Sequence, residues 1–126
     1  MESITLNMPV TVTSENISGL LCCAFEGGSN YWYGDLHVAK YPAGTSAVDY
    51  KWWHLEIPLV KGGALGLEDV EEGKQHKLTL AKIKRGLRIM ADKYPWHWQN
   101  FRSDNADADT GDAFLQCCIF GDVIYG

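Results

Sequence analysis

The sequence predicts an α+β fold in which an antiparallel sheet of four to five strands packs against an N-terminal helix and C-terminal helices. Apolar residues recur at helical spacing near the N-terminus and over the C-terminal third, whereas residues in the middle of the chain follow strand patterns. The chain has 126 residues, of which 46% are hydrophobic, and this composition suffices for a core. We therefore expect residues 1–126 to form a single domain.

The first expected elements are a strand and a helix. Residues 4–12 alternate loosely between apolar and polar side chains, which favours an opening strand. Over residues 14–26 the apolar positions are spaced three and four apart, and Thr13 or Ser14 can cap the helix. The glycine pair that follows ends this helix, because glycine adopts the left-handed conformation of a helix C-cap without penalty.

The middle of the chain is expected to form the sheet. Residues 31–41 are rich in aromatic and β-branched side chains. Residues 51–57 alternate between two faces, and Pro58 limits that strand or marks a sheet edge. Residues 64–70 and 75–79 flank a Glu-Glu-Gly-Lys turn, so they predict a hairpin.

Helices are expected to return after Thr79, which is a suitable N-cap. An apolar stripe at helical spacing covers residues 80–94, and Pro95 separates it from a short helix at 96–102. The basic run within residues 82–88 is interpreted as a solvated helix face, with an anion site as the alternative.

The last expected helix, at about residues 110–120, is apolar on nearly all sides. Between residues 113 and 120 only Gln116 is polar. A helix of this kind must be covered on every side, so it either passes through the core or docks on a neighbouring subunit. For this reason we expect a homo-oligomer.

Composition bears on compartment and partners. The formal net charge of −5 disfavours direct binding to nucleic acid, which needs clustered Lys and Arg. No apolar run reaches the roughly 18 residues of a membrane helix, and no secretory signal is recognisable. Buried free thiols in a reducing compartment are expected for the four cysteines, because they form two vicinal pairs within helical patterns. Together these features predict a cytoplasmic protein.

Motifs for catalysis and metal binding are lacking. The acidic loop at 104–112 is not a calcium loop, because neither the glycine nor the glutamate of an EF-hand falls at its required position. The four histidines have no partner at metal-ligand spacing, and there is no nucleophile elbow. We expect no metal, no cofactor and no enzymatic activity.

One segment has the composition of a ligand site. Residues 26–33 combine two glycines, two small polar residues and three aromatic residues at a helix-to-strand junction. Glycines let a ligand approach the backbone, and aromatic rings can stack on a base. The alternative interpretation is a helix C-cap followed by a half-buried aromatic strand.

The segment at 26–32, pieces of 78–95 and the tail at 107–126 resemble a family of small phage and prophage proteins. Members of that family usually carry no functional name, so the resemblance implies a setting and no catalytic residues. The setting is the host cytoplasm, where small phage proteins often counter host defences. Such proteins commonly either sequester a nucleotide second messenger or block a host protein.

From the residues and this resemblance we predict a non-catalytic counter-defence protein that binds and sequesters a small nucleotide-type host signal. The expected ligand-binding residues are Asn30, Tyr31, Trp32 and Tyr33, with Arg85, Arg88 or Arg102 holding the phosphate. The alternative is a protein–protein inhibitor that blocks a host defence protein or its nucleic-acid site. Its tryptophans would anchor the contact, and a cluster of aspartates would mimic nucleic acid: Asp104, Asp107, Asp109 and Asp112.

Overall fold

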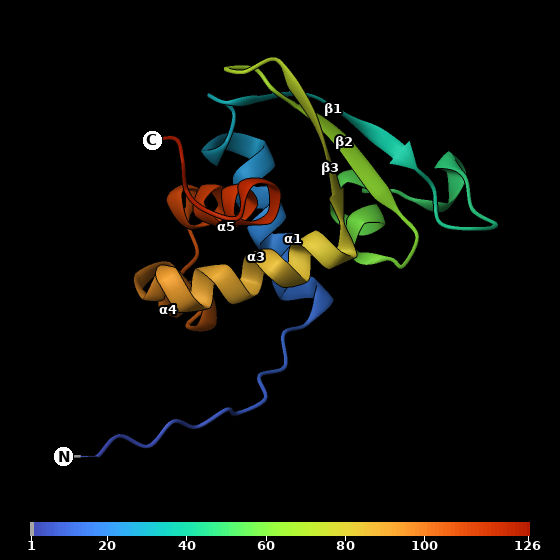
Figure 1. The fold of residues 1–126 in the computed structure, drawn as a ribbon. Coiled ribbons are helices and arrows are strands. Elements are labelled where there is room, and N and C mark those ends of the chain that lie inside the picture. The colour runs from blue at the N-terminus through green and yellow to red at the C-terminus, as the bar shows by residue number, and fades with distance from the viewer. Residues whose placement is uncertain (1) are drawn as a thin grey trace.

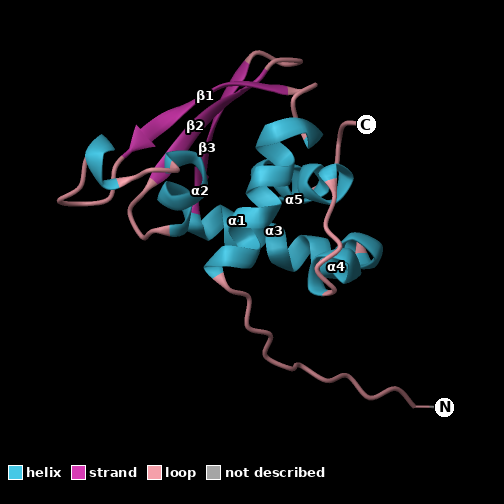
Figure 2. Ribbon diagram, turned by 180° about the vertical axis from the view of Figure 1, so that it is seen from behind, coloured by secondary structure: helices cyan, strands magenta, loops and turns pink. Residues whose placement is uncertain are grey.

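The computed structural model describes residues 2–126 and confirms an α+β fold with an antiparallel sheet (Figure 1). Its three strands, β1 (Tyr33–Lys40), β2 (Ala64–Asp69) and β3 (Lys74–Thr79), lie in the order β1-β2-β3. Figure 2 shows the larger helices together on one side of this sheet. Their bounds are α1 (Ser14–Cys23), α3 (Leu80–Lys93), α4 (Pro95–Arg102) and α5 (Ala108–Phe120).

The prediction of four to five strands was wrong, because only three form within residues 2–126. Residues 51–57 form a helical turn, α2 (Trp53–Glu56), followed by a 3₁₀ turn at Ile57–Leu59. The backbone N–H of Trp52 donates to the Glu56 carboxylate at 2.7 Å, which closes the first turn. Pro58 fits the start of the 3₁₀ turn, where no backbone donor is needed.

The predicted opening strand is also absent among the described residues. Residues 4–12 are extended, but they pair with no strand. Figure 1 shows this segment projecting away from the start of α1. An isolated extended segment has no ladder of backbone hydrogen bonds, so its alternating sequence alone could not make it a strand. We call residues 2–12 the N-terminal arm.

The sheet combines one regular and one irregular pairing. In the β2–β3 hairpin every residue from Ala64 to Asp69 is paired in register. The β1–β2 pairing is interrupted twice, and Asp35 near the first interruption has a φ of 51°. The apolar residues of the inner face, among them Leu65, Leu67 and Leu78, are fully buried against the helices.

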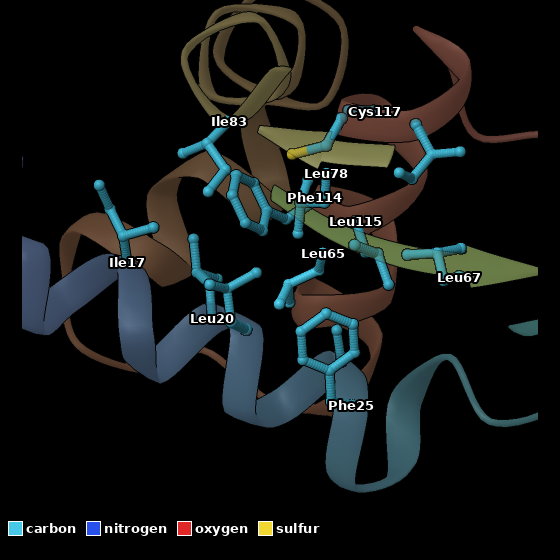
Figure 3. Packing of buried hydrophobic residues seen from close by; sticks show 14 of the residues in the cluster. Ile17, Leu20, Phe25, Leu65, Leu67, Leu78, Ile83, Phe114, Leu115 and Cys117 are labelled. Carbon is cyan, nitrogen blue, oxygen red and sulfur yellow. The ribbon is translucent and has the colours of Figure 1, made fainter. Parts of the chain in front are cut away.

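Helix α5 forms the centre of the core. It contacts both α1 and α3, and nine of its residues are buried. In Figure 3 Phe114 and Leu115 of α5 lie among side chains of α1 and the sheet. The apolar character of residues 113–120 is thus explained within one chain. It no longer supports an interface with a second subunit.

Close approach of the helices depends on glycine at the contact points. Gly111 in α5 lies against Cys23 and Ala24 at the end of α1, and a Cβ atom there would be 2.5 Å from Cys23 Cβ and 2.7 Å from Ala24 N. Gly86 in α3 leaves similarly little room beside Cys118. The absence of side chains at both positions lets α5 pack tightly on either side.

Gln116 is the single polar residue in the apolar part of α5, and it binds the C-terminal tail through hydrogen bonds. Its Oε1 atom accepts hydrogen bonds from the backbone N–H groups of Ile124 and Tyr125, at 2.8 and 2.9 Å. Its Nε2 group donates to Tyr31 Oη and to the carbonyl of Tyr125, both at 3.2 Å. The fully buried amide is therefore satisfied on both sides, as a buried polar group must be.

Asp107 caps α5. Its substitution should show whether its contribution to stability comes from the capping hydrogen bond or from its negative charge. Its carboxylate accepts the N–H of Thr110 at 2.9 Å, and this bond lowers the pKa of Asp107 below its ordinary value of 3.8. Asp107→Ala should decrease the free energy of unfolding by about 1 kcal/mol, whereas Asp107→Asn should conserve it at neutral pH, because asparagine caps equally well.

The two substitutions should also differ in pH dependence. A carboxyl group with a lowered pKa stabilises the fold above its ordinary pKa and loses that contribution as the pH falls through the lowered value. Urea titrations at neutral pH and below about pH 4 measure this effect. The same loss of stability in acid for the wild type and Asp107→Asn would contradict the assignment.

Candidate functional site

The residues expected to bind a ligand belong to a hydrogen-bonded junction around Asp112 of α5. The Asp112 carboxylate accepts Ser29 Oγ at 2.8 Å, Trp32 Nε1 at 2.7 Å and Tyr31 Oη at 2.6 Å. The three donors follow a π-helical turn, η1 (Ala24–Gly28), which continues α1. Asp112 thus ties the start of β1 to the central helix.

Within this junction the four predicted residues differ in accessibility. Trp32 is fully buried and packs against Phe120 and Tyr125, with ring centroids 5.1 and 6.1 Å away. Tyr33 is half-buried and donates to the carbonyl of Phe25 at 2.7 Å. Asn30 and Tyr31 remain exposed. Burial, followed by the hydrogen bond to Asp112, raises the pKa of Tyr31 to about 12, so its hydroxyl stays a donor.

The three arginines expected to hold a phosphate have other partners. Arg85 donates to the carbonyls of Cys118 and Ile119 at the end of α5. Arg102 donates to the carbonyl of Thr11 at 3.2 Å and lies over the ring of Trp98. Arg88 lines a groove beside α3. Within residues 2–126, no hydrogen bond or ion pair joins these arginines to residues 30–33.

A group of lysines lies around the N-terminus of α3. Four lysines line a pocket of about 660 Å³, which we call the cationic pocket. The pocket also includes Gly62 and Gly63, which place no side chain in it, and Thr79, the N-cap of α3. The lysines come from the end of β1, the loop before β2, strand β3 and the second turn of α3: Lys40, Lys61, Lys77 and Lys84.

The electrostatics of this region favour an anion. Among the described residues, none of the four lysines forms an ion pair, although the chain carries a net charge of −5. The N-terminus of α3 adds a partial positive charge at the same place. Burial, followed by the charge of Arg85, lowers the pKa of the neighbouring Lys82. This direction is expected of an ammonium group among other cations.

Sequence reasoning missed the cationic pocket because its lysines are far apart along the chain. Only Lys84 lies in the basic run at 82–88, for which an anion site was the alternative interpretation. The other three become neighbours of Lys84 only through the pairing of β1 with β2 and of β2 with β3. No local signal could have shown this.

An apolar groove of about 510 Å³ runs along α3 beside the cationic pocket, and the two share Leu80 and Lys84. We call it the α3 groove. Its floor and walls are mainly Ile17, Leu59, Leu80, Ile83, Leu87 and Trp98, with Val10 and Val12 of the N-terminal arm at one side. An apolar groove next to unpaired cations is suited to amphipathic or extended ligands.

The aspartates at 104–112 have several different roles. Asp107 caps α5 and Asp112 holds the junction, so neither carboxylate is free of protein hydrogen bonds. Asp104 has a φ of 61° in the preceding turn, and it is exposed, as is Asp109. Within residues 2–126, no group of three or more His, Cys, Asp or Glu side chains is placed to hold a metal ion.

The fold is thus an α+β arrangement with a three-stranded antiparallel sheet, and its most distinctive surface features are the cationic pocket and the α3 groove. No protein-family model, curated protein or solved structure matches the chain. Over residues 2–126, no helix has the length and apolar character needed to span a bilayer.

Proposed function

We propose that the chain is a non-catalytic binding protein that sequesters a small nucleotide-type anion, with the phosphate held in the cationic pocket. The observation that carries this proposal is the convergence of four unpaired lysines on one pocket of an otherwise acidic protein. All four lysines are exposed, so solvent screens much of their mutual repulsion, and an anion in the pocket would neutralise what remains.

The geometry of the pocket fits phosphate groups. Its volume of about 660 Å³ lies in the range of small-molecule sites. Each lysine supplies three rotatable donors on a flexible stem and can follow phosphate oxygens as a point charge. Gly62 has a φ of 88°, and a Cβ atom on Gly63 would collide with Ile57, so both positions favour glycine. Of the two, Gly62 is exposed, so its backbone is open to a ligand.

A nucleotide also needs a surface for its base. Tyr41 directly follows Lys40, and its ring stacks on Tyr50 with the centroids 6.3 Å apart. Tyr41 does not line the pocket, but it is 36% exposed, so its ring is the aromatic surface that we propose for the base. Sequestration of a host signal matches the resemblance to small phage proteins, which act stoichiometrically in the host cytoplasm.

Calorimetric titration with a panel of linear and cyclic nucleotides tests this proposal. One member of the panel should bind in a 1:1 ratio to the chain, and Lys61→Ala or Lys84→Ala should weaken it about tenfold or more, because each removes a charge-assisted contact. Lys51→Ala and Lys74→Ala remove exposed lysines outside the pocket and serve as matched controls. Equal loss from both sets would indicate a general charge effect and contradict the site.

The same titration separates the other possibilities. Loss of binding in Asn30→Ala or Tyr31→Phe, with the lysine variants unaffected, would place the ligand at the Asp112 junction instead. Ligand released by heating the complex should be chemically intact, whereas an altered ligand would show that the protein is an enzyme. Absence of binding across the panel would overturn the proposal.

The runner-up function is inhibition of a host protein, and exposed tryptophans favour it. Trp52 and Trp96 are both exposed, the latter at the start of α4. Tryptophan is a frequent anchor of protein–protein interfaces. If no nucleotide binds, we propose that a stoichiometric host partner is retained by the wild type and lost from Trp52→Ala or Trp96→Ala.

A further inference from the structure

The N-terminal arm has the pattern of a strand but no partner. Its residues Ile4, Leu6, Met8 and Val10 are 86%, 73%, 74% and 55% exposed. They alternate with Thr5, Asn7 and Pro9, so in an extended chain their side chains lie on one face. From Ser3 to Ser14 there is no charged residue. Four large apolar side chains on one face of an uncharged segment indicate a surface that is covered in the working protein.

The α3 groove is the apolar surface that lies next to the arm. The arm of the same chain contributes only Val10 and Val12 to the groove. Further out, residues 6–9 line a separate pocket with Arg88, Ala91 and Asp92, in the half of α3 that is far from Leu80. Residues 4–9 of the same chain do not line the groove, so its part towards Leu59 and Leu80 can take a segment of another chain.

Two hydrogen bonds at the base of the arm fix the direction in which it leaves α1. Thr13 caps α1 by accepting the N–H of Asn16 at 3.1 Å, and Arg102 donates to the carbonyl of Thr11 at 3.2 Å. The chain thus leaves α1 pointing away from the body, as Figure 1 shows. To reach the open part of its own groove, the chain would have to reverse direction next to Pro9, whose ring restricts the backbone there.

The arm and the open groove match in length, polarity and charge. Residues 4–10 span six steps of extended chain, about 20 Å. Helix α3, with 14 residues, is about 21 Å long. Apolar side chains meet an apolar groove, and Arg88 at its rim can bind an arm carbonyl as Arg102 already binds that of Thr11. Residues 3–12 of the arm carry no charged side chain, so this part of the arm is not repelled by an acidic body.

We propose that the arm of one copy lies in the α3 groove of a second copy, and that the second copy returns its own arm in the same way. The interface is then closed and two-fold symmetric, so no apolar arm is left to recruit a third chain. A stable complex buries roughly 1,200–2,000 Å², and two exchanged arms share this area between two grooves. This dimer goes beyond the proposed ligand site and does not depend on it.

Light scattering on the full chain, together with arm variants, tests the exchange. The wild type should have twice the monomer mass of 14.1 kDa at micromolar concentration. The double variant Leu6→Asp with Met8→Asp should be a monomer, because its charges cannot enter an apolar groove. The matched control, Thr5→Asp with Asn7→Asp, adds the same two charges to the other face of the arm and should stay a dimer.

A second measurement identifies where the arm lies. In a mixture of isotope-labelled and unlabelled chains, filtered nuclear Overhauser effects should connect the methyl groups of Ile4 and Leu6 in one copy with Leu59 and Leu80 in the other. Effects within one copy only would show an arm folded back on itself and overturn the exchange. A monomeric wild type, or a dimer that survives Leu6→Asp with Met8→Asp, would overturn it equally.

Discussion

Replacing Gly111 by alanine is expected to destabilise the protein by about 3 kcal/mol or more, the largest effect among the substitutions considered. The added methyl group would be 2.5 Å from Cys23 Cβ, 2.7 Å from Ala24 N and 2.8 Å from the Cys23 carbonyl carbon. Two of these atoms belong to the backbone and cannot rotate away. Helix α5 would have to move away from the end of α1, which would loosen the whole core.

Gly19→Ala is the matched control for this substitution. Gly19 lies within α1, and a Cβ atom there meets nothing within 4 Å. Alanine should therefore stabilise the fold by about 0.5–1 kcal/mol, through the better helix propensity of alanine. Denaturant titrations of the two variants give the comparison. Similar effects at both positions would contradict the tight contact of α5 with α1.

Asp112→Ala is expected to lower the free energy of unfolding by about 3 kcal/mol. The substitution removes the acceptor of three hydrogen bonds, two of them from the buried residues Ser29 and Trp32. A buried donor without an acceptor costs about 1–3 kcal/mol, and bonds to a charged group are stronger than neutral ones. The segment before β1 would then be held to α5 only by weaker contacts, such as the hydrogen bond of Gln116 to Tyr31 and the packing of Trp32 on Phe120.

Two further variants show whether the effect of Asp112→Ala comes from hydrogen bonding. Asp109→Ala removes an exposed aspartate one turn earlier in α5 and should cost less than about 1 kcal/mol. Asp112→Asn should be intermediate, because the amide oxygen still accepts while its nitrogen faces the donor Tyr31 Oη. Thermal or urea unfolding measures all three. A loss in Asp109→Ala equal to that in Asp112→Ala would point to helix electrostatics alone.

Local patterns predicted where helices begin and break and where one hairpin forms, but they did not predict the number of strands. The N-cap at Thr13, the break at Pro95 and the hairpin of β2 and β3 all appear where the sequence predicts them. Residues 51–57 were misassigned because an alternating run of seven residues also fits a short helical turn. The hydrogen bonds that decide between the two are those of the Leu55 and Glu56 N–H groups to the Trp52 carbonyl and of the Trp52 N–H to the Glu56 carboxylate, and periodicity does not reveal them.

The candidate site could be predicted only in part, for a related reason. Glycines, small polar residues and aromatics at 26–33 did mark a special junction, but the acceptor that organises it, Asp112, lies 80 residues beyond Trp32. The alternative interpretation of a half-buried aromatic strand describes Tyr33, whereas Trp32 is fully buried in the turn before β1. The lysines of the cationic pocket come together through strand pairing, which a single sequence does not specify.

The four free cysteines differ in burial, since Cys22 and Cys23 are partly exposed and Cys117 and Cys118 are buried. Their reactivity with a thiol reagent can therefore report on local unfolding. Cys22 is partly exposed, but its hydrogen bond to Glu26 raises its pKa to about 11 and keeps it protonated. Burial raises the pKa of Cys117 to about 12, and Cys118 is enclosed beside Gly86. A thiol reagent can reach the pair in α5 only when the core separates, whereas fraying of α1 suffices for Cys22. Labelling rates at the two pairs thus give separate opening free energies for the edge and the centre of one molecule, without any added probe.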